Sequence, residues 1–182
     1  MSTLTARPNT ALLVVDVQND VVANAYRRDE VIAAINAAID KARAAGVPVI
    51  WVQHSDDELV RDSDGWQYVA ELQRSDGEPL VHKHYNDSFE ETTLEAELAQ
   101  RGVGHVVVSG AETDACVRAT IHGALVRGYD TTLVGDAHTT NDYTSYGMPA
   151  PDLVIAHTNG YWQYQSAPGR TAAVVPAAEI TF

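Results

Sequence analysis

Short apolar runs alternate along this chain with segments of helical periodicity, and this alternation constrains the fold more than any other feature. The run "ALLVVD" at 11–16 has no polar side chain before its terminal carboxylate, which is typical of a strand buried on both faces. The segment 29–46 then repeats apolar residues three and four positions apart, which predicts a helix. Asp29 is its predicted N-cap and Gly46 its predicted end.

The same alternation continues to the end of the chain. The predicted strands are 11–16, 47–54, 79–83, 105–110, 130–136 and 171–176, and the predicted helices after the first are 89–102, 116–128 and 151–158. Strands that alternate with helices indicate βαβ units, in which helices cover both faces of a parallel sheet. No linker or internal repeat divides the sequence. We therefore predict one α/β domain over 1–182, a three-layer, Rossmann-like fold with a six-stranded parallel sheet.

Composition narrows the classes of function. Hydrophobic residues make up 45% and charged residues 20% of the chain, as in a globular protein. Asp and Glu total 25 against 12 Lys and Arg, and the net charge of −13 argues against nucleic acid or an anionic membrane as a partner. The N-terminus has no apolar signal core, and no apolar run approaches the roughly 20 residues of a membrane span, so we expect a cytoplasmic protein.

Three chemically active side chains follow predicted strands, at the edge where ligands bind in open α/β sheets. Asp16 ends the first strand, Lys83 ends the third, and Cys116, the only cysteine, lies shortly after the fourth. A helix N-terminus and a nearby cation lower the pKa of a thiol, and Thr113 or Asp114 is the predicted N-cap. A nucleophile, a base and a cation together indicate nucleophilic acyl transfer. Taken singly, a lone cysteine is most often a small buried apolar residue.

Three motifs in a fixed order carry a resemblance to a known family. They are "LLVVDVQND" (12–20), "HKHYNDSFEET" (82–92) and "VVVSGAETDACVRATIHGALVRGYDTTLVGDAHTT" (106–140). With them the chain resembles, over nearly its whole length, the isochorismatase-like cysteine hydrolases, which include nicotinamidases and N-carbamoylsarcosine amidohydrolase. The resemblance implies a six-stranded sheet and assigns the family's Asp–Lys–Cys catalytic triad to Asp16, Lys83 and Cys116.

The resemblance also implies a reaction, the hydrolysis of a C–N bond in a small amide, carbamoyl or lactam substrate through a thioester. Asp16 would take the thiol proton of Cys116, and Lys83 would keep both groups poised. Backbone N–H groups of Glu112 and Cys116 would form the oxyanion hole, after a cis peptide bond between Ala111 and Glu112. The reaction requires no cofactor, and the only partner it requires is a small-molecule substrate.

Two other functions remain open. An isochorismatase-type vinyl-ether hydrolase uses the aspartate as an acid and needs no thiol, so the presence of Cys116 with Lys83 favours the amidase. A non-catalytic binding domain of the same fold is the second alternative, against which the intact triad argues. The sequence does not identify the substrate.

The sequence departs from the family pattern at three positions. Several nicotinamidases bind a metal through an aspartate and histidines after the second strand, but His54 stands alone there, so we expect no metal site. Val21 occupies a position where phenylalanine is frequent, which argues against a nicotinamide-stacking pocket. Glu112 stands where a small residue is usual. It faces either the pocket, which would favour a cationic substrate, or solvent or a neighbouring subunit, and we favour the second interpretation.

Eight residues are candidates for the substrate pocket: Gln18, Val21, His54, Trp66, Tyr85, Phe89, Thr113 and His138. Core packing is the alternative for the aromatic residues, and helix capping is the alternative for His138. We also expect a homo-oligomer, a dimer or tetramer. The grounds are the family resemblance and the aromatic-rich stretch 156–170, which fits no predicted helix or strand and suits an interface.

Overall fold

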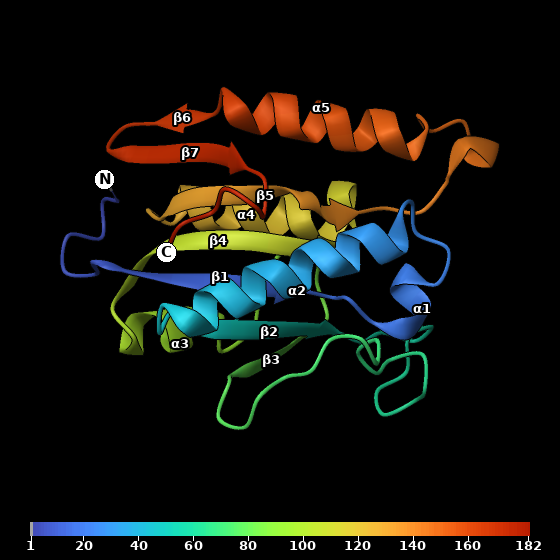
Figure 1. Cartoon of the computed structure of the whole chain (residues 1–182), viewed down its shortest axis with the longest axis horizontal. Helices are drawn as coiled ribbons and strands as arrows, with labels where there is room; N and C mark the ends of the chain where they lie inside the picture. The colour runs from blue at the N-terminus through green and yellow to red at the C-terminus, as the bar shows by residue number, and fades with distance from the viewer. Residues whose placement is uncertain (1) are drawn as a thin grey trace.

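The computed structural model describes residues 2–182, which form one sheet of seven strands with helices on both faces (Figure 1). The strands are β1 (Asn9–Val15), β2 (Val49–His54), β3 (Leu80–Lys83), β4 (Val103–Ala111), β5 (Asp130–Thr139), β6 (Ser166–Ala167) and β7 (Arg170–Val175). The helices are α1 (Asn19–Val22), α2 (Arg28–Ala44), α3 (Leu94–Gln100), the π-helix η1 (Thr113–Val117), α4 (Arg118–Val126), the 3₁₀ helix η2 (Thr144–Tyr146) and α5 (Pro151–Gln163).

The strands are ordered β3-β2-β1-β4-β5-β7-β6, and every neighbouring pair is parallel except β6 with β7. The predicted α/β fold, a parallel sheet covered on both faces, is confirmed. The sheet has seven strands rather than six because the two residues of β6 pair with the start of β7 across a turn. The chain proceeds outward in one direction from β1 to β3 and in the other from β4 onward. The strand order therefore switches between β1 and β4, which is where ligands bind in such sheets.

Strand β1 is buried on both faces, as its continuous apolar run predicts. Its five residues from Ala11 to Val15 have no exposed surface. Leu12 belongs to a core that includes α2, whereas Leu13 belongs to a second core that includes α3 and α4. These helices lie on opposite sides of the sheet (Figure 1). Full burial of such a side chain contributes roughly 1.5–3 kcal/mol, so β1 fixes the centre of the sheet and the position of the residue that follows it.

The limits of two helices differ from the prediction. Helix α2 is preceded by Arg27, which adopts a left-handed conformation with φ 51°, so Asp29 lies in the first turn and is not the N-cap. Gly46, with φ +69°, ends the helix as predicted. Helix α3 covers only part of 89–102. The preceding residues form turns, in which the Thr92 hydroxyl donates a hydrogen bond to the Ser88 carbonyl.

The C-terminal region is more regular than predicted. Helix α5 continues to Gln163, so the stretch 156–170 belongs mainly to α5 and to the turn between β6 and β7. Trp162 in this stretch is buried against His122 of α4, with ring centroids 4.9 Å apart. Tyr161 and Tyr164 in the same stretch are exposed, at 41% and 87%, and the homo-oligomer stays a prediction. Among residues 2–182, no helix combines the length and hydropathy needed to cross a membrane.

Candidate active site

The structure brings together the three residues predicted to be catalytic, at the carboxyl ends of the strands. Asp16 follows β1, Lys83 ends β3, and Cys116 lies in η1 after β4. The Lys83 Nζ is 2.6 Å from Asp16 Oδ2 and 3.1 Å from Cys116 Sγ. Asp16 and Lys83 are both 1% exposed, whereas Cys116 is half-buried.

Two unusual backbone conformations place Asp16 against the segment that carries the thiol. Asp16 has φ 51°, a left-handed conformation that non-glycine residues adopt mainly where the surrounding structure enforces it, often at functional sites. Its amide donates a 2.9 Å hydrogen bond to the Val52 carbonyl of β2. Gly110 in β4 has φ +124°, and a Cβ there would lie 2.0 Å from the Val15 carbonyl oxygen. Glycine at 110 thus permits the close approach of β4 to the end of β1.

Burial and mutual charge set the protonation of the three groups. Burial raises the pKa of Asp16, and the positive charge of Lys83 opposes this rise. Burial also raises the pKa of the Cys116 thiol, to about 12, with a further contribution from the Asp16 carboxylate and opposition from Lys83. For Lys83, burial favours the neutral amine, but Asp16 and Cys116 outweigh it and the pKa is raised. The resting site therefore holds a neutral thiol, and the lowered thiol pKa predicted from the sequence is wrong.

The segment 109–117 forms the turn on which Cys116 lies. The Ala111–Glu112 peptide bond is cis, as predicted. The Glu112 carbonyl accepts hydrogen bonds from the amides of Ala115 and Val117, at 3.2 and 3.1 Å. Glu112 thus precedes η1 in the capping position without a side-chain cap. The predicted N-caps are wrong because their side chains are bonded elsewhere. Thr113 Oγ1 is 2.9 Å from His138 Nδ1, and Asp114 Oδ1 accepts a hydrogen bond from the Thr140 hydroxyl.

His54, at the end of β2, links the three groups to a cavity. Its Nδ1 lies 3.3 Å from Lys83 Nζ, and its Nε2 lies 3.0 Å from Asp56 Oδ2. The buried side chain of Gln18 holds this residue in place. It donates to the carbonyls of His54 and Trp66 and accepts from the His54 amide. Gln18 therefore orients His54, and its amide is not free for a ligand.

A cavity of about 330 Å³ adjoins the Cys116 turn at this end of the sheet. Its lining residues are Asp20, Val21, His54, Asp56, Glu58, Leu59, Glu112, Asn141 and Tyr143. Glu112 thus faces the cavity, and the interpretation favoured from the sequence is wrong. Asn141 and Tyr143 were not predicted from the sequence, although both follow β5. The loop after β2 supplies Asp56 and Glu58, and no sequence pattern marked them.

Other predicted pocket residues lie away from this cavity. Trp66 is buried and stacks on His82 with ring centroids 5.6 Å apart. Phe89 is part of the core that includes α4, as the packing alternative proposed. Tyr85 is 51% exposed and does not line the cavity. His138 is buried between the side chains of Thr113 and Asn159 and caps no helix, so neither it nor Thr113 is free for a ligand.

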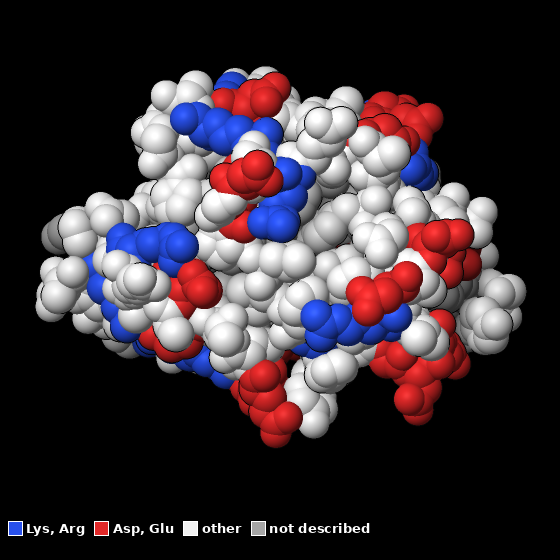
Figure 2. Space-filling view, turned by 90° about the horizontal axis from the view of Figure 1, so that it is seen from below, with Lys and Arg blue, Asp and Glu red and all other residues white. Residues whose placement is uncertain are grey.

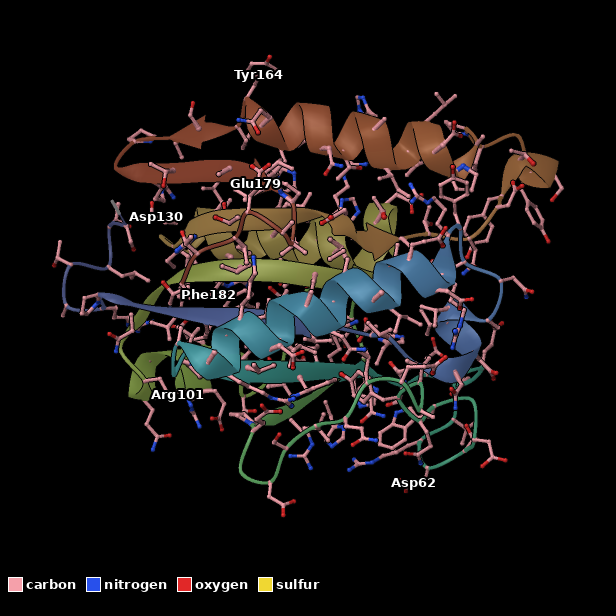
Figure 3. All side chains as sticks on the ribbon, in the orientation of Figure 1. Asp62, Arg101, Asp130, Tyr164, Glu179 and Phe182 are labelled. Atoms are coloured by element: carbon pink, nitrogen blue, oxygen red, sulfur yellow. The ribbon has the colours of Figure 1, made fainter. Side chains whose placement is uncertain are left out.

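A larger cavity, of about 670 Å³, lies at the opposite edge of the sheet. Arg101 and Phe182 line it, and Figure 3 shows both toward the end of the molecule where the strands begin, away from Asp62 in the loop after β2. Asp16, Lys83 and Cys116 line neither of the two cavities. The smaller cavity is next to them because it is lined by His54, whose Nδ1 lies 3.3 Å from Lys83 Nζ, and by Glu112, which precedes η1. Within residues 2–182, no group of three or more His, Cys, Asp or Glu side chains is arranged to hold a metal ion.

Comparison with known proteins identifies the family. A family model described as the isochorismatase domain matches residues 10–148, well over half of the chain. The chain belongs to the isochorismatase family. The resemblance inferred from the three sequence motifs is therefore confirmed, and the matched region includes Asp16, Lys83 and Cys116.

Individual members of the family match at moderate identity. A streptothricin hydrolase of Streptomyces noursei is 35% identical over 142 residues, which cover 75% of this chain and 56% of that protein. An uncharacterised isochorismatase family protein of Bacillus subtilis strain 168 is 29% identical over 180 residues, covering 93% of this chain and 97% of that protein. The crystal structure of N-carbamoylsarcosine amidase from Thermoplasma acidophilum is 26% identical with a TM-score of 0.75, covering 94% of this chain and 98% of that one. The chain thus spans little more than half the length of the streptothricin hydrolase.

Proposed function

We propose that this protein is a cysteine hydrolase that cleaves a C–N bond of a small amide, carbamoyl or lactam substrate through a thioester. The observation that carries the proposal is the position of Lys83, whose ammonium contacts both the Asp16 carboxylate and the Cys116 sulfur. Two similar proteins, a streptothricin hydrolase and N-carbamoylsarcosine amidase, are named for hydrolysis and for amide cleavage, and their names support this reaction class.

The first step is proton transfer coupled to nucleophilic attack. Because the thiol pKa is about 12, Cys116 does not rest as a thiolate and requires a base when the substrate arrives. Asp16 accepts the thiol proton, and the sulfur forms a bond to the carbonyl carbon. The pKa of Asp16, raised by burial, makes the carboxylate a stronger base than an exposed aspartate. Lys83 stays protonated and stabilises the negative charge as it moves from Asp16 to sulfur.

The second step releases the amine, and the third regenerates the enzyme. The carbonyl oxygen becomes an oxyanion, for which the backbone N–H groups of Glu112 and Cys116 are the proposed donors. The C–N bond breaks, the nitrogen takes the proton from Asp16, and a thioester to Cys116 remains. Water gives a proton to Asp16, and its oxygen attacks the thioester carbonyl. The C–S bond then breaks, and the sulfur recovers the proton from Asp16, so the acid and the free thiol are formed.

Substitution of Cys116 separates this mechanism from the alternatives. We expect Cys116→Ala to reduce kcat by at least ~10³-fold on any amide, urea or lactam that the wild type hydrolyses, since covalent catalysis depends on the sulfur. Release of ammonia or amine measures turnover, and mass spectrometry of an acid-quenched reaction detects the acyl group on Cys116. A Cys116→Ala enzyme that keeps full activity refutes the thioester route. The vinyl-ether alternative predicts instead that neither protein releases ammonia or amine, and that Cys116→Ala still hydrolyses a vinyl ether, because that reaction needs no thiol.

A further inference from the structure

The cavity lined by His54 and Glu112 carries an excess of negative charge. Four of its nine described lining residues are carboxylates, Asp20, Asp56, Glu58 and Glu112, and none of the nine is Lys or Arg. His54 is paired with Asp56, so it does not offset the other three. The ammonium of Lys83, behind His54, is neutralised by Asp16 at 2.6 Å. Figure 2 shows groups of acidic side chains toward the same end of the molecule, at which β2 ends.

Glu112 differs from an ordinary acidic surface residue. It is half-buried, and its Oε1 accepts hydrogen bonds from the Asn141 amide and from the Tyr143 hydroxyl at 2.8 Å. Both donors are neutral, and burial and Glu112 together raise the pKa of Tyr143 to about 12, so the phenol stays a donor. Within residues 2–182, Glu112 forms no ion pair with Lys, Arg or His, whereas Glu78, which lies outside this cavity, pairs with Arg43. The carboxylate is therefore oriented toward the cavity without a cation beside it.

Glu112 belongs both to the acidic wall of the cavity and to the turn that carries Cys116. The Glu112 carbonyl accepts the first hydrogen bonds of the turn that carries Cys116. The Glu112 side chain lines the cavity. His54, on the same cavity wall, lies 3.3 Å from Lys83 Nζ, which in turn is 3.1 Å from Cys116 Sγ. Val21 and Leu59 contribute apolar surface to the same wall. A volume of about 330 Å³ is at the lower end of the range for small-molecule sites.

We infer that the enzyme selects substrates in which a cationic group, an ammonium or quaternary ammonium, lies a few bonds from the scissile carbonyl, and that Glu112 is the residue that selects them. The inference rests on the proposed amide hydrolysis and adds the charge of the substrate. The attraction between two unit charges at contact is large enough near a protein surface to change kcat/KM by about tenfold or more. A neutral substrate of equal shape gains none of this attraction.

The test uses two amides of the same shape and different charge. Betaine amide carries a trimethylammonium group, and 3,3-dimethylbutanamide replaces the nitrogen with carbon. We expect kcat/KM, measured by ammonia release, to be at least about tenfold higher for betaine amide, which corresponds to about 1.4 kcal/mol. Glu112→Gln keeps the shape and the acceptor for Asn141 and Tyr143, and we expect it to reduce this ratio to near one. Glu58→Gln, on an exposed loop, should reduce the ratio by a smaller factor.

Controls separate charge recognition from general damage and from failure of the proposed function. Glu179→Gln removes an exposed charge outside the cavity and should leave the ratio unchanged. Binding of both amides to the Cys116→Ala protein, followed by NMR titration, measures the preference without turnover. If the preference appears in binding and Glu112→Gln removes it, while the wild type releases no ammonia, the inference holds and the amidase proposal fails. Equal binding of the two amides, or a ratio that Glu112→Gln leaves intact, overturns the inference.

Discussion

The cavities at the two ends of the parallel strands differ in volume and in how deeply the nearby ion pair is buried. At the amino ends of the strands, the larger cavity of about 670 Å³ is lined in part by Glu78, which pairs with the partly exposed Arg43. At the carboxyl ends, a cavity of about 330 Å³ is lined by His54, which lies 3.3 Å from Lys83 of the fully buried pair of Lys83 and Asp16. The reactive groups lie near the smaller cavity. Their pKa values are shifted because water is excluded from them and each charge has few partners, and such shifts are typical of functional sites. Buried charge, and not volume, distinguishes the candidate active site.

The largest expected change in the free energy of unfolding comes from breaking the buried ion pair, and the partly exposed pair is the comparison. Lys83→Met leaves Asp16 buried without its counter-charge, and removal of one partner from a buried pair costs about 3–5 kcal/mol. Arg43→Met breaks a pair whose arginine side chain is 33% exposed, and partly exposed pairs contribute about 1 kcal/mol or less. Urea denaturation of both variants measures the difference in the free energy of unfolding. Similar losses for the two variants would contradict the distinction between the edges.

A pair of glycines extends the comparison to the backbone. Gly110 at the carboxyl edge and Gly46 at the amino edge both have positive φ, but only Gly110 has backbone atoms where a Cβ would lie. Gly46→Ala therefore costs about 1–2 kcal/mol, the ordinary penalty for a left-handed alanine. Gly110→Ala should cost roughly 2–4 kcal/mol, since it adds a steric clash with Val15, and should also lower kcat by displacing the turn that carries Cys116. Equal losses of stability would show that β4 can move away from β1 at little cost.

The sequence predicts the sheet well because its strands are short, apolar and buried on both faces. Each of the six parallel strands was found from its apolar run, but β6 has only two residues, Ser166 and Ala167, and no pattern marks it. The sequence predicts that helix α5 ends near Thr158, and the next two residues, Asn159 and Gly160, have low helix propensity. The structure overrides this preference by burying Trp162, one turn further on.

The candidate site was predictable only in part. Strand ends locate Asp16, Lys83 and Cys116, since topology alone brings these positions to one edge. The protonation of Cys116 was not predictable, because it depends on how deeply the thiol is buried and on its distance from the Asp16 charge. The cavity wall was missed for a related reason. Glu112 and the loop residue Glu58 become neighbours only after the chain has folded, and no periodic pattern records the path of an irregular loop.

Asp16→Asn changes the shape of the site least, and it tests whether the Asp16 carboxylate sets the pKa of the Cys116 thiol. Loss of the proposed base should reduce kcat by at least ~10²-fold, the scale of general acid–base catalysis. The Asp16 carboxylate contributes to the raised thiol pKa, and Lys83 opposes it, so Asn at 16 should lower the pKa of Cys116. Iodoacetamide labelling of the variant should therefore reach a given rate at lower pH than in the wild type, although turnover falls. Asp40→Asn, on the exposed face of α2, is the matched control and should change neither rate.

The pH dependence of the wild type has a definite direction under the same mechanism. Asp16 accepts the thiol proton only when it is ionised, so kcat/KM should fall as the pH decreases through the pKa of Asp16. Burial raises this pKa, and the acidic limb should therefore lie above the ordinary aspartate range, which is centred near 3.9. Replacement of Asp16 removes the group responsible, so the residual activity of Asp16→Asn should lack this limb. An acidic limb that persists unchanged in Asp16→Asn would assign the titration to another group and would remove Asp16 from the role of base.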